Sequence, residues 1–167
     1  MKRFFRIMAI CLFVVAFSGQ AMAVNGFKAQ GSATIPGIMY YYTDSNTWSL
    51  PYIMLTNTSS TSVNCQVNVY GSEGEDLGAA ALVAKGGTNW ITILNGPGIF
   101  EIPPHSTRCY ILHFPASPYY TYAHAIVEWN SNDQFQKNAL IGSCELRNKN
   151  QGIVTTSYLP VNNGNPF

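Results

Sequence analysis

Apolar and polar residues alternate over several short stretches of the chain, a pattern typical of β-strands with one buried face. The clearest stretch is 63–70, where every second residue is a valine or a cysteine. Two more inward faces are predicted, from Ala123 to Trp129 and from Leu140 to Leu146. The pattern predicts seven to nine short strands, near 33–42, 50–56, 63–70, 89–94, 99–102, 107–114, 121–129, 138–146 and 151–159.

Clusters of Gly, Pro, Asn and Ser separate these stretches and predict turns. Only Leu77–Lys85 has a helical composition, and nine residues are compatible with a marginal helix, a strand or a connection. Many short strands with frequent turns indicate an all-β, antiparallel sandwich or barrel. We expect one β-sandwich domain over 24–159. The segment 160–167 is rich in Asn, Gly and Pro and predicts a flexible C-terminal tail.

Several motifs along the chain belong together, at 51–59, 63–76, 102–107, 123–129 and 131–133, and they span about residues 50–146. With these motifs the chain resembles the bacterial exported immunoglobulin-like β-sandwich domains. The resemblance implies an antiparallel immunoglobulin-like β-sandwich. His105 stands where these domains usually have a glycine, and the cysteines are not placed as in antibody domains. Because these motifs encode strand packing, the resemblance implies a fold and no activity.

The first 23 residues have the layout of a signal peptide. Lys2, Arg3 and Arg6 are followed by an apolar run, Ile7–Phe17, and by the small residues of Ala21-Met22-Ala23. The apolar run is shorter than the roughly 20 residues that a membrane-spanning helix needs. We therefore expect export to the periplasm, the cell surface or the medium, and no transmembrane helix.

Charge argues against nucleic acid as a partner. The chain has nine basic and eight acidic residues, and three of the basic ones lie in the predicted leader. The remaining six are scattered and form no basic patch for phosphates. Charged residues make up only 10% of the chain, so it is not a highly charged disordered segment.

Three cysteines remain after the leader, Cys65, Cys109 and Cys144. An exported protein meets an oxidising compartment, so we expect a disulfide, and the odd number leaves one thiol over. The strand layout implied by the immunoglobulin-like resemblance places Cys65 and Cys109 near the same end of the sandwich. The resemblance therefore implies a Cys65–Cys109 bridge between the sheets, with Cys144 buried and free.

The sequence offers no catalytic, metal or cofactor site. No Gly-x-Ser-x-Gly motif, Cys-x-x-Cys pair or His-rich metal motif is present. His113 and His124 on neighbouring strands, or the acidic turn 73–76, are the two weak metal hypotheses, and a surface histidine and a solvated turn are the ordinary interpretations.

Aromatic residues are frequent, at 13% of the chain. Adjacent strand residues point to opposite faces, so clusters such as Tyr40–Tyr42 and Tyr119–Tyr122 must expose some of their rings. Exposed rings stack on sugars or form protein interfaces. The candidate binding residues are Trp48, Tyr119, Tyr120 and Tyr122.

These observations favour an exported, non-enzymatic protein that acts as a structural or protein-interaction subunit at the cell surface or outside the cell. Its partner would be another protein or a second copy, joined through exposed sheet edges. The alternative is a carbohydrate-binding module that uses exposed Tyr and Trp side chains. A small secreted hydrolase and an outer-membrane barrel are less favoured, because no nucleophile–base pair is recognisable and 162–166 cannot continue a strand to Phe167.

Overall fold

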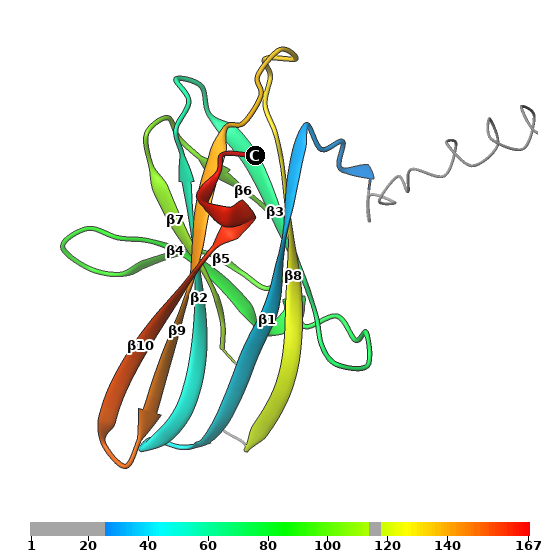
Figure 1. The fold of residues 1–167 in the computed structure, drawn as a ribbon. Helices are drawn as coiled ribbons and strands as arrows, with labels where there is room; N and C mark the ends of the chain where they lie inside the picture. Colours follow the sequence, from blue (N-terminus) through cyan, green and yellow to red (C-terminus); the bar gives the residue numbers. More distant parts are fainter. Residues whose placement is uncertain (1–25, 114–117) are drawn as a thin grey trace, which may run out of the picture.

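The computed structural model describes residues 26–113 and 118–167 and is all-β and antiparallel, which confirms the predicted fold class at that level. The predicted signal peptide, 1–23, lies outside the described residues. In the part that is described, no helix is long and apolar enough to cross a membrane. Figure 1 shows the strands: β1 (Gly31–Asp44), β2 (Thr47–Asn57), β3 (Val63–Tyr70), β4 (Ala81–Lys85), β5 (Ile91–Asn95), β6 (Ile99–Ile102), β7 (Thr107–Leu112), β8 (Tyr119–Asn130), β9 (Leu140–Asn150) and β10 (Ile153–Pro160).

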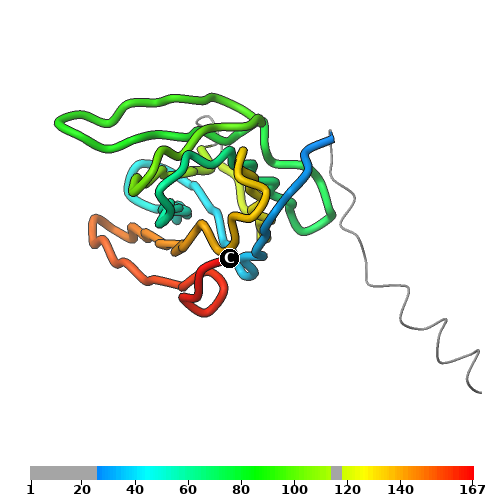
Figure 2. Tube along the Cα trace, turned by 90° about the horizontal axis from the view of Figure 1, so that it is seen from above, coloured from blue at the N-terminus to red at the C-terminus, as the bar shows by residue number. Residues whose placement is uncertain are grey.

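The ten strands form one hydrogen-bonded sheet that curls until it is nearly closed, as the view from above shows (Figure 2). The order is β5-β4-β7-β2-β1-β8-β3-β6, and β9 and β10 extend the sheet from the other side of β2. Strand β2 is the branch point. One of its edges pairs with β9 over the whole strand, whereas the other pairs with β1 at 47–49 and with β7 at 52–56.

Alternation places one side of β3 and one side of β8 in the core, as the sequence predicts. In β3 the side chains at 63, 65, 67 and 69 are buried, and in β8 those at 123, 125, 127 and 129 are buried. Trp129 has no exposed surface, and its indole Nε1–H donates to the backbone oxygen of Phe167 at 2.8 Å. Gly31 passes directly over this ring, where any larger side chain would overlap the indole.

The segment Leu77–Lys85 contains the one strand that the pattern does not predict as such. It begins with a single 3-10 turn, Gly78–Ala80, and continues as β4 between β7 and β5. Val83 of β4 is fully buried opposite Tyr110 of β7. Pairing on both edges fixes the extended backbone here, so that ten strands form where seven to nine are predicted.

The segment 160–167 also differs from its prediction, because it packs against the sheet rather than forming a flexible tail. It contains a short 3-10 segment, η3 (Val161–Gly164), and both Val161 and Phe167 are buried. The backbone of Phe167 exchanges two hydrogen bonds with Leu140, at 2.9 and 3.1 Å. Asn162 and Asn163 adopt positive φ, which lets the chain turn back towards the core.

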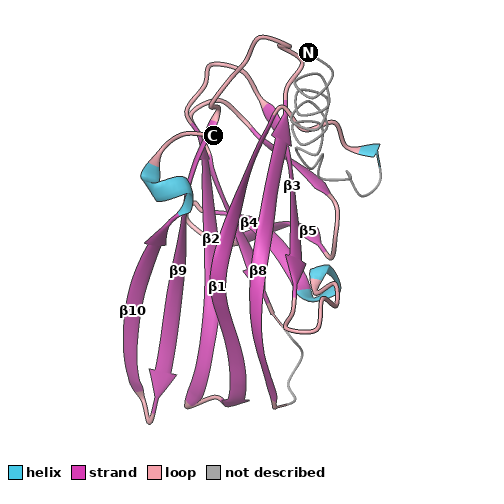
Figure 3. Ribbon diagram, turned by 45° about the vertical axis from the view of Figure 1, so that its right-hand side comes forward, coloured by secondary structure: helices cyan, strands magenta, loops and turns pink. Residues whose placement is uncertain are grey.

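Strands β9 and β10 form a long hairpin that continues the sheet beyond β2 (Figure 3). The two-residue turn consists of Gln151 and Gly152, both with positive φ, at 49° and 86°. Positive φ at both central residues is the geometry of a type I′ turn, whose twist matches the twist of the flanking strands. The hairpin therefore has a defined register, with Asn150 opposite Ile153 and Ser143 opposite Pro160.

Candidate functional site

Two of the predicted binding residues lie together on an exposed part of β8. Tyr120 and Tyr122 are 55% and 58% exposed, and their rings meet edge to face at 5.2 Å between centroids. Tyr41 of β1 lies opposite Tyr120, and their rings stack at 6.4 Å. We call these three residues, Tyr41, Tyr120 and Tyr122, the tyrosine row.

The other two predicted residues, Trp48 and Tyr119, are less exposed. Tyr119 is partly buried against the core, with its ring 6.1 Å from that of Tyr40. Trp48 is on β2, half-buried and opposite Lys149 of β9. Tyr119 nevertheless lines one hollow, of about 410 Å³, together with Tyr41 and Tyr120 of the tyrosine row. Trp48 is not among the residues that line it, so the four predicted residues do not form one surface.

The Cys65–Cys109 disulfide that the resemblance implied is absent: all three cysteines of the described chain are free thiols. Cys65 points into the core from β3, with no exposed surface. Cys109 of β7 is directed to the outer side of the sheet, where it lines a hollow together with Met54 and Arg147. A bridge would require the two side chains to meet across a sheet layer, which the geometry of a disulfide does not allow.

Burial keeps these thiols protonated. It raises the pKa of Cys65 far above the ordinary range, and it raises the pKa of Cys109 to about 12 against an opposing effect of Arg147. Burial, with a smaller contribution from Glu145, raises the pKa of Cys144 to about 11. Because the thiolate is the reactive form, none of the three has the environment of a nucleophile.

Strand β10 is the most exposed regular element of the described chain. All eight of its residues are exposed, including Ile153, Val154, Tyr158 and Leu159. Within the described residues its only strand partner is β9, so its other edge is open. The strand carries no charged side chain. It is thus a long, uncharged, partly apolar sheet edge.

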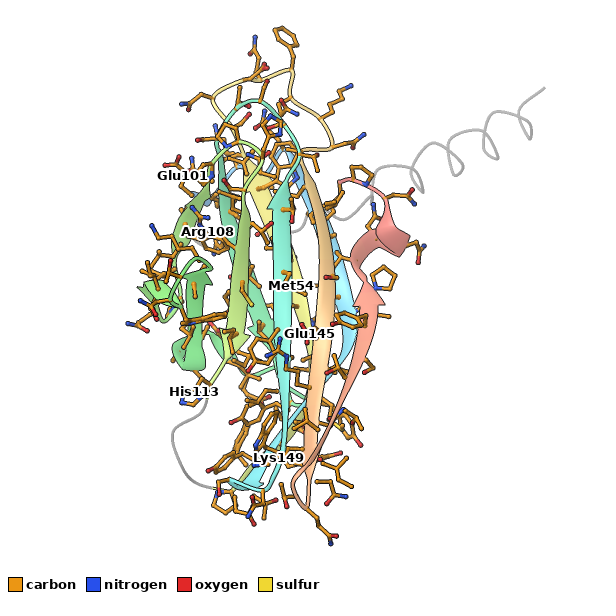
Figure 4. The ribbon with its side chains drawn as sticks, turned by 90° about the vertical axis from the view of Figure 1, so that its left-hand side faces the viewer. Met54, Glu101, Arg108, His113, Glu145 and Lys149 are labelled. Carbon is orange, nitrogen blue, oxygen red and sulfur yellow. The ribbon has the colours of Figure 1, made fainter. Side chains whose placement is uncertain are left out.

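A cleft lies on the outer side of β2, β7 and β9, beside the hairpin. It consists of two hollows of about 270 and 250 Å³ that share Tyr52, Trp90 and Arg147 in their walls. Trp90, in the connection between β4 and β5, is 53% exposed. Figure 4 shows this side of the molecule, with Met54 and Glu145 on adjacent strands and His113 at the end of β7.

An ion pair lies in the floor of the cleft. The Nε of Arg147 donates to Oε1 of the buried Glu145 at 2.6 Å, and the guanidinium lies 4.6 Å from the centre of the Tyr52 ring. The hydrogen bond to Glu145 raises the pKa of Arg147, and burial raises the pKa of Tyr52. The cleft therefore presents the rings of Tyr52 and Trp90 beside the ion pair of Arg147 and Glu145, whose opposite charges neutralise each other.

Sequence reasoning names Trp48 and the tyrosines but not this cleft. The Glu145-x-Arg147 spacing does place both side chains on one face of a strand, and that spacing is the signal that could find the pair. Nothing in the local pattern brings Trp90 over it. Among the described residues, no three of His, Cys, Asp and Glu gather closely enough to hold a metal ion.

Comparison with known proteins adds little to these observations. No family model and no curated protein matches the chain. A search of solved structures finds a chain described as "Crystal Structure of Thermotoga maritima 1070", at 9% sequence identity and a TM-score of 0.49, covering 84% of this chain and 100% of that chain.

Proposed function

We propose that this chain is an exported, non-enzymatic subunit that joins other proteins at the cell surface or outside the cell, and that strand β10 is its joining element. The observation that carries the proposal is the open edge of β10, with all eight residues exposed and no charge. Proteins usually protect such an edge with charged residues, a proline within the strand, a bulge or a covering segment. Here the regular pairing with β9 runs without a bulge, and the proline comes last, at Pro160.

An open edge provides both parts of strand-addition binding. The outward backbone groups supply hydrogen bonds, and alternate side chains supply specificity. Val154 and Tyr158 lie on the same side of β10 and are both exposed, so that a strand added beside them gains apolar contact as well as hydrogen bonds. The leader-like residues 1–23 support the proposal of export. The open edge supports it independently, because an exposed strand edge of this kind promotes aggregation in the crowded cytoplasm.

The finer fold assignment is part of the proposal. An immunoglobulin-like sandwich is supported by two groups of strands, β1-β8-β3-β6 and β9-β2-β7-β4, whose inward side chains share one core.

Site-specific photo-crosslinking in cells that export the protein tests the proposed function. A photoreactive side chain replaces Tyr158 on β10, and in a matched control it replaces Thr92 on β5, the edge strand at the other end of the sheet. We expect protein adducts, identified by mass spectrometry, at position 158 and far fewer at position 92. A β10 edge that gives no protein adduct, or equal labelling at both positions, would overturn the proposal.

Carbohydrate binding is a second candidate function, supported by the cleft rather than by the predicted tyrosines. Exposed Trp90 and half-buried Tyr52 offer ring faces for a sugar, and Arg147 and Glu145 offer planar hydrogen-bonding groups without net charge. Affinity electrophoresis in gels that contain a neutral glucan, mannan or galactan tests it. Retardation by one polysaccharide should disappear in Trp90→Ala and persist in Tyr122→Ala. The reverse result would assign sugar binding to the tyrosine row, and no retardation by any of the three would reject the cleft.

A further inference from the structure

We propose that the strand that joins β10 is β10 of a second copy of this chain, in an antiparallel pair whose twofold axis passes between Thr156 and the same residue of the second copy. This inference rests on the proposed function, and it names the partner and the register. Three features of β10 carry it: the positions of its unpaired backbone groups, the symmetry of its side chains, and the residues that bound it.

The first feature is which backbone groups point outwards. In a hairpin with a two-residue turn, the pair next to the turn exchanges hydrogen bonds, and hydrogen-bonded pairs then recur at every second residue. Asn150 and Ile153 are the pair next to the turn, so the odd-numbered residues of β10 bond to β9. The N–H and C=O groups of Val154, Thr156 and Tyr158 are therefore directed to the open edge.

A twofold axis between the two copies of Thr156 uses all of these groups. It places Thr156 opposite Thr156 of the second copy and Val154 opposite Tyr158, so that outward-facing residues meet outward-facing residues. Each of these positions then becomes a hydrogen-bonded pair of an antiparallel ladder. An axis perpendicular to the sheet also keeps each face of the sheet continuous across the junction, as an isologous interface requires.

The second feature is that the side chains of β10 are symmetric in kind about Thr156. On one face, Val154 meets Tyr158 and threonine meets threonine. On the other face, Ile153 meets Leu159 and Thr155 meets Ser157. Apolar pairs and hydroxyl pairs directly opposite each other are the combinations that stabilise antiparallel strands.

Charge is compatible with this pairing. A twofold axis places each charged side chain near the same side chain of the second copy, where like charges repel. Strand β10 has no charged side chain, so this repulsion does not arise within it. The nearest cations on the same hairpin, Arg147 and Lys149, belong to β9. Three strand spacings of about 4.8 Å separate β9 from its copy, a distance of about 14 Å that exceeds the Debye length at physiological salt.

The third feature is that the ladder has natural ends. In this register Gly152 of the turn lies opposite Pro160 of the second copy, and proline has no N–H to donate. The segment 161–167 follows Pro160 and packs back on the sheet through Val161 and Phe167, and all residues of β10 stay exposed. The paired segment is thus limited to the seven residues 153–159 of each copy.

Sedimentation of the purified protein, over a concentration series in physiological salt, tests the inference. We expect a monomer–dimer equilibrium for the native chain. Thr156→Lys and Thr156→Glu, each of which opposes like charges across the axis, should each weaken dimerisation at least tenfold. An equimolar mixture of the two variants should dimerise again as a Lys–Glu heterodimer. Thr92→Lys on the β5 edge is the matched control and should dimerise like the native chain.

Three results would overturn the inference. They are a native chain that stays monomeric, a Thr156→Lys variant that dimerises as the native chain does, and a mixture of the Lys and Glu variants that stays monomeric. A different result distinguishes the failure of this inference from the failure of the proposed function. If photo-crosslinking at position 158 gives adducts with another protein only, β10 is still the joining element, while its partner is not a second copy. Normal circular dichroism of the variants confirms that their folding is unchanged.

Discussion

Strands β8 and β10 have similar side chains and opposite environments. Both are rich in β-branched and aromatic residues. Strand β8 lies between β1 and β3, and six of its residues are buried, whereas β10 has β9 alone and no buried residue. The comparison shows that a strand pattern predicts backbone conformation, while the number of neighbouring strands and layers decides what the side chains do. Strand β8 supplies stability, and β10 is free to supply binding.

The largest effect is expected from Trp129 on β8. Replacement by alanine leaves a large cavity and removes the donor to the backbone oxygen of Phe167. Trp129→Ala should lower the free energy of unfolding by about 3–5 kcal/mol, measured by urea denaturation. Trp129→Phe is the control, since it keeps a ring in the core and should cost less. A loss below about 1 kcal/mol for the alanine variant would contradict the assigned burial.

A somewhat smaller effect is expected from Phe167, because the backbone hydrogen bonds with Leu140 stay in place when its side chain is shortened. Phe167→Ala should cost about 3 kcal/mol in urea denaturation, near the lower limit for a buried phenylalanine. Pro166→Ala, at an exposed neighbouring position, is the control and should change little. Equal, small effects for both variants would mean that 160–167 behaves as the flexible tail that its composition predicts.

Alkaline pH should destabilise the fold through Cys144, which is buried on β9, whereas the residues of β10 beside it are exposed. Burial raises the pKa of Cys144 from its ordinary value near 9 to about 11, so the unfolded chain loses this proton first as the pH rises. Between about pH 9 and 11 the unfolded state then binds fewer protons than the native state, and stability falls by up to about 1.4 kcal/mol per pH unit for this thiol. Below pH 8 the contribution is constant.

Urea denaturation at pH 8–10.5 measures this slope, and Cys144→Ala should reduce it. Cys65 and Cys109 act in the same direction, so that part of the slope remains in the variant. A slope that Cys144→Ala leaves unchanged would contradict the burial of this thiol on the core side of β9.

The smallest effect on folding is expected from Tyr158 on β10, which is 66% exposed. Tyr158→Ser should change the free energy of unfolding by no more than about 0.5 kcal/mol in dilute, monomeric protein. The same variant should weaken dimerisation, which sedimentation measures. A large loss of stability in the dilute monomer would show that β10 contributes to the fold in the way that β8 does.

Much of the architecture could be predicted from alternation. The inward faces of β3 and β8 are those that the pattern at 63–70 and 123–129 predicts, because a period of two is a property of the strand itself. Strand β4 was ambiguous, since Leu77–Lys85 is rich in residues that favour helices. Its pairing with β7 and β5 overrides that preference, and pairing partners cannot be read from nine residues.

The binding surfaces were less predictable for the same reason. The position of Trp48 depends on the pairing of β2 with β9. The position of Trp90 beside Arg147 depends on where the pairing of β4 with β7 places the connection between β4 and β5. The Cys65–Cys109 pairing failed because a strand layout taken from a resemblance does not tell which face of its strand Cys109 occupies.

The sequence by itself determined the all-β class, the positions of most strands and their inward faces, because these depend on the alternation of side chains along each strand. It also contains the uncharged, symmetric stretch at 153–159. Only the tertiary structure decided that this stretch lies at an open edge while the similar stretch at 119–130 lies between two strands. Strand neighbours and core contacts join residues far apart in the chain, and their energies depend on the assembled sheet as a whole.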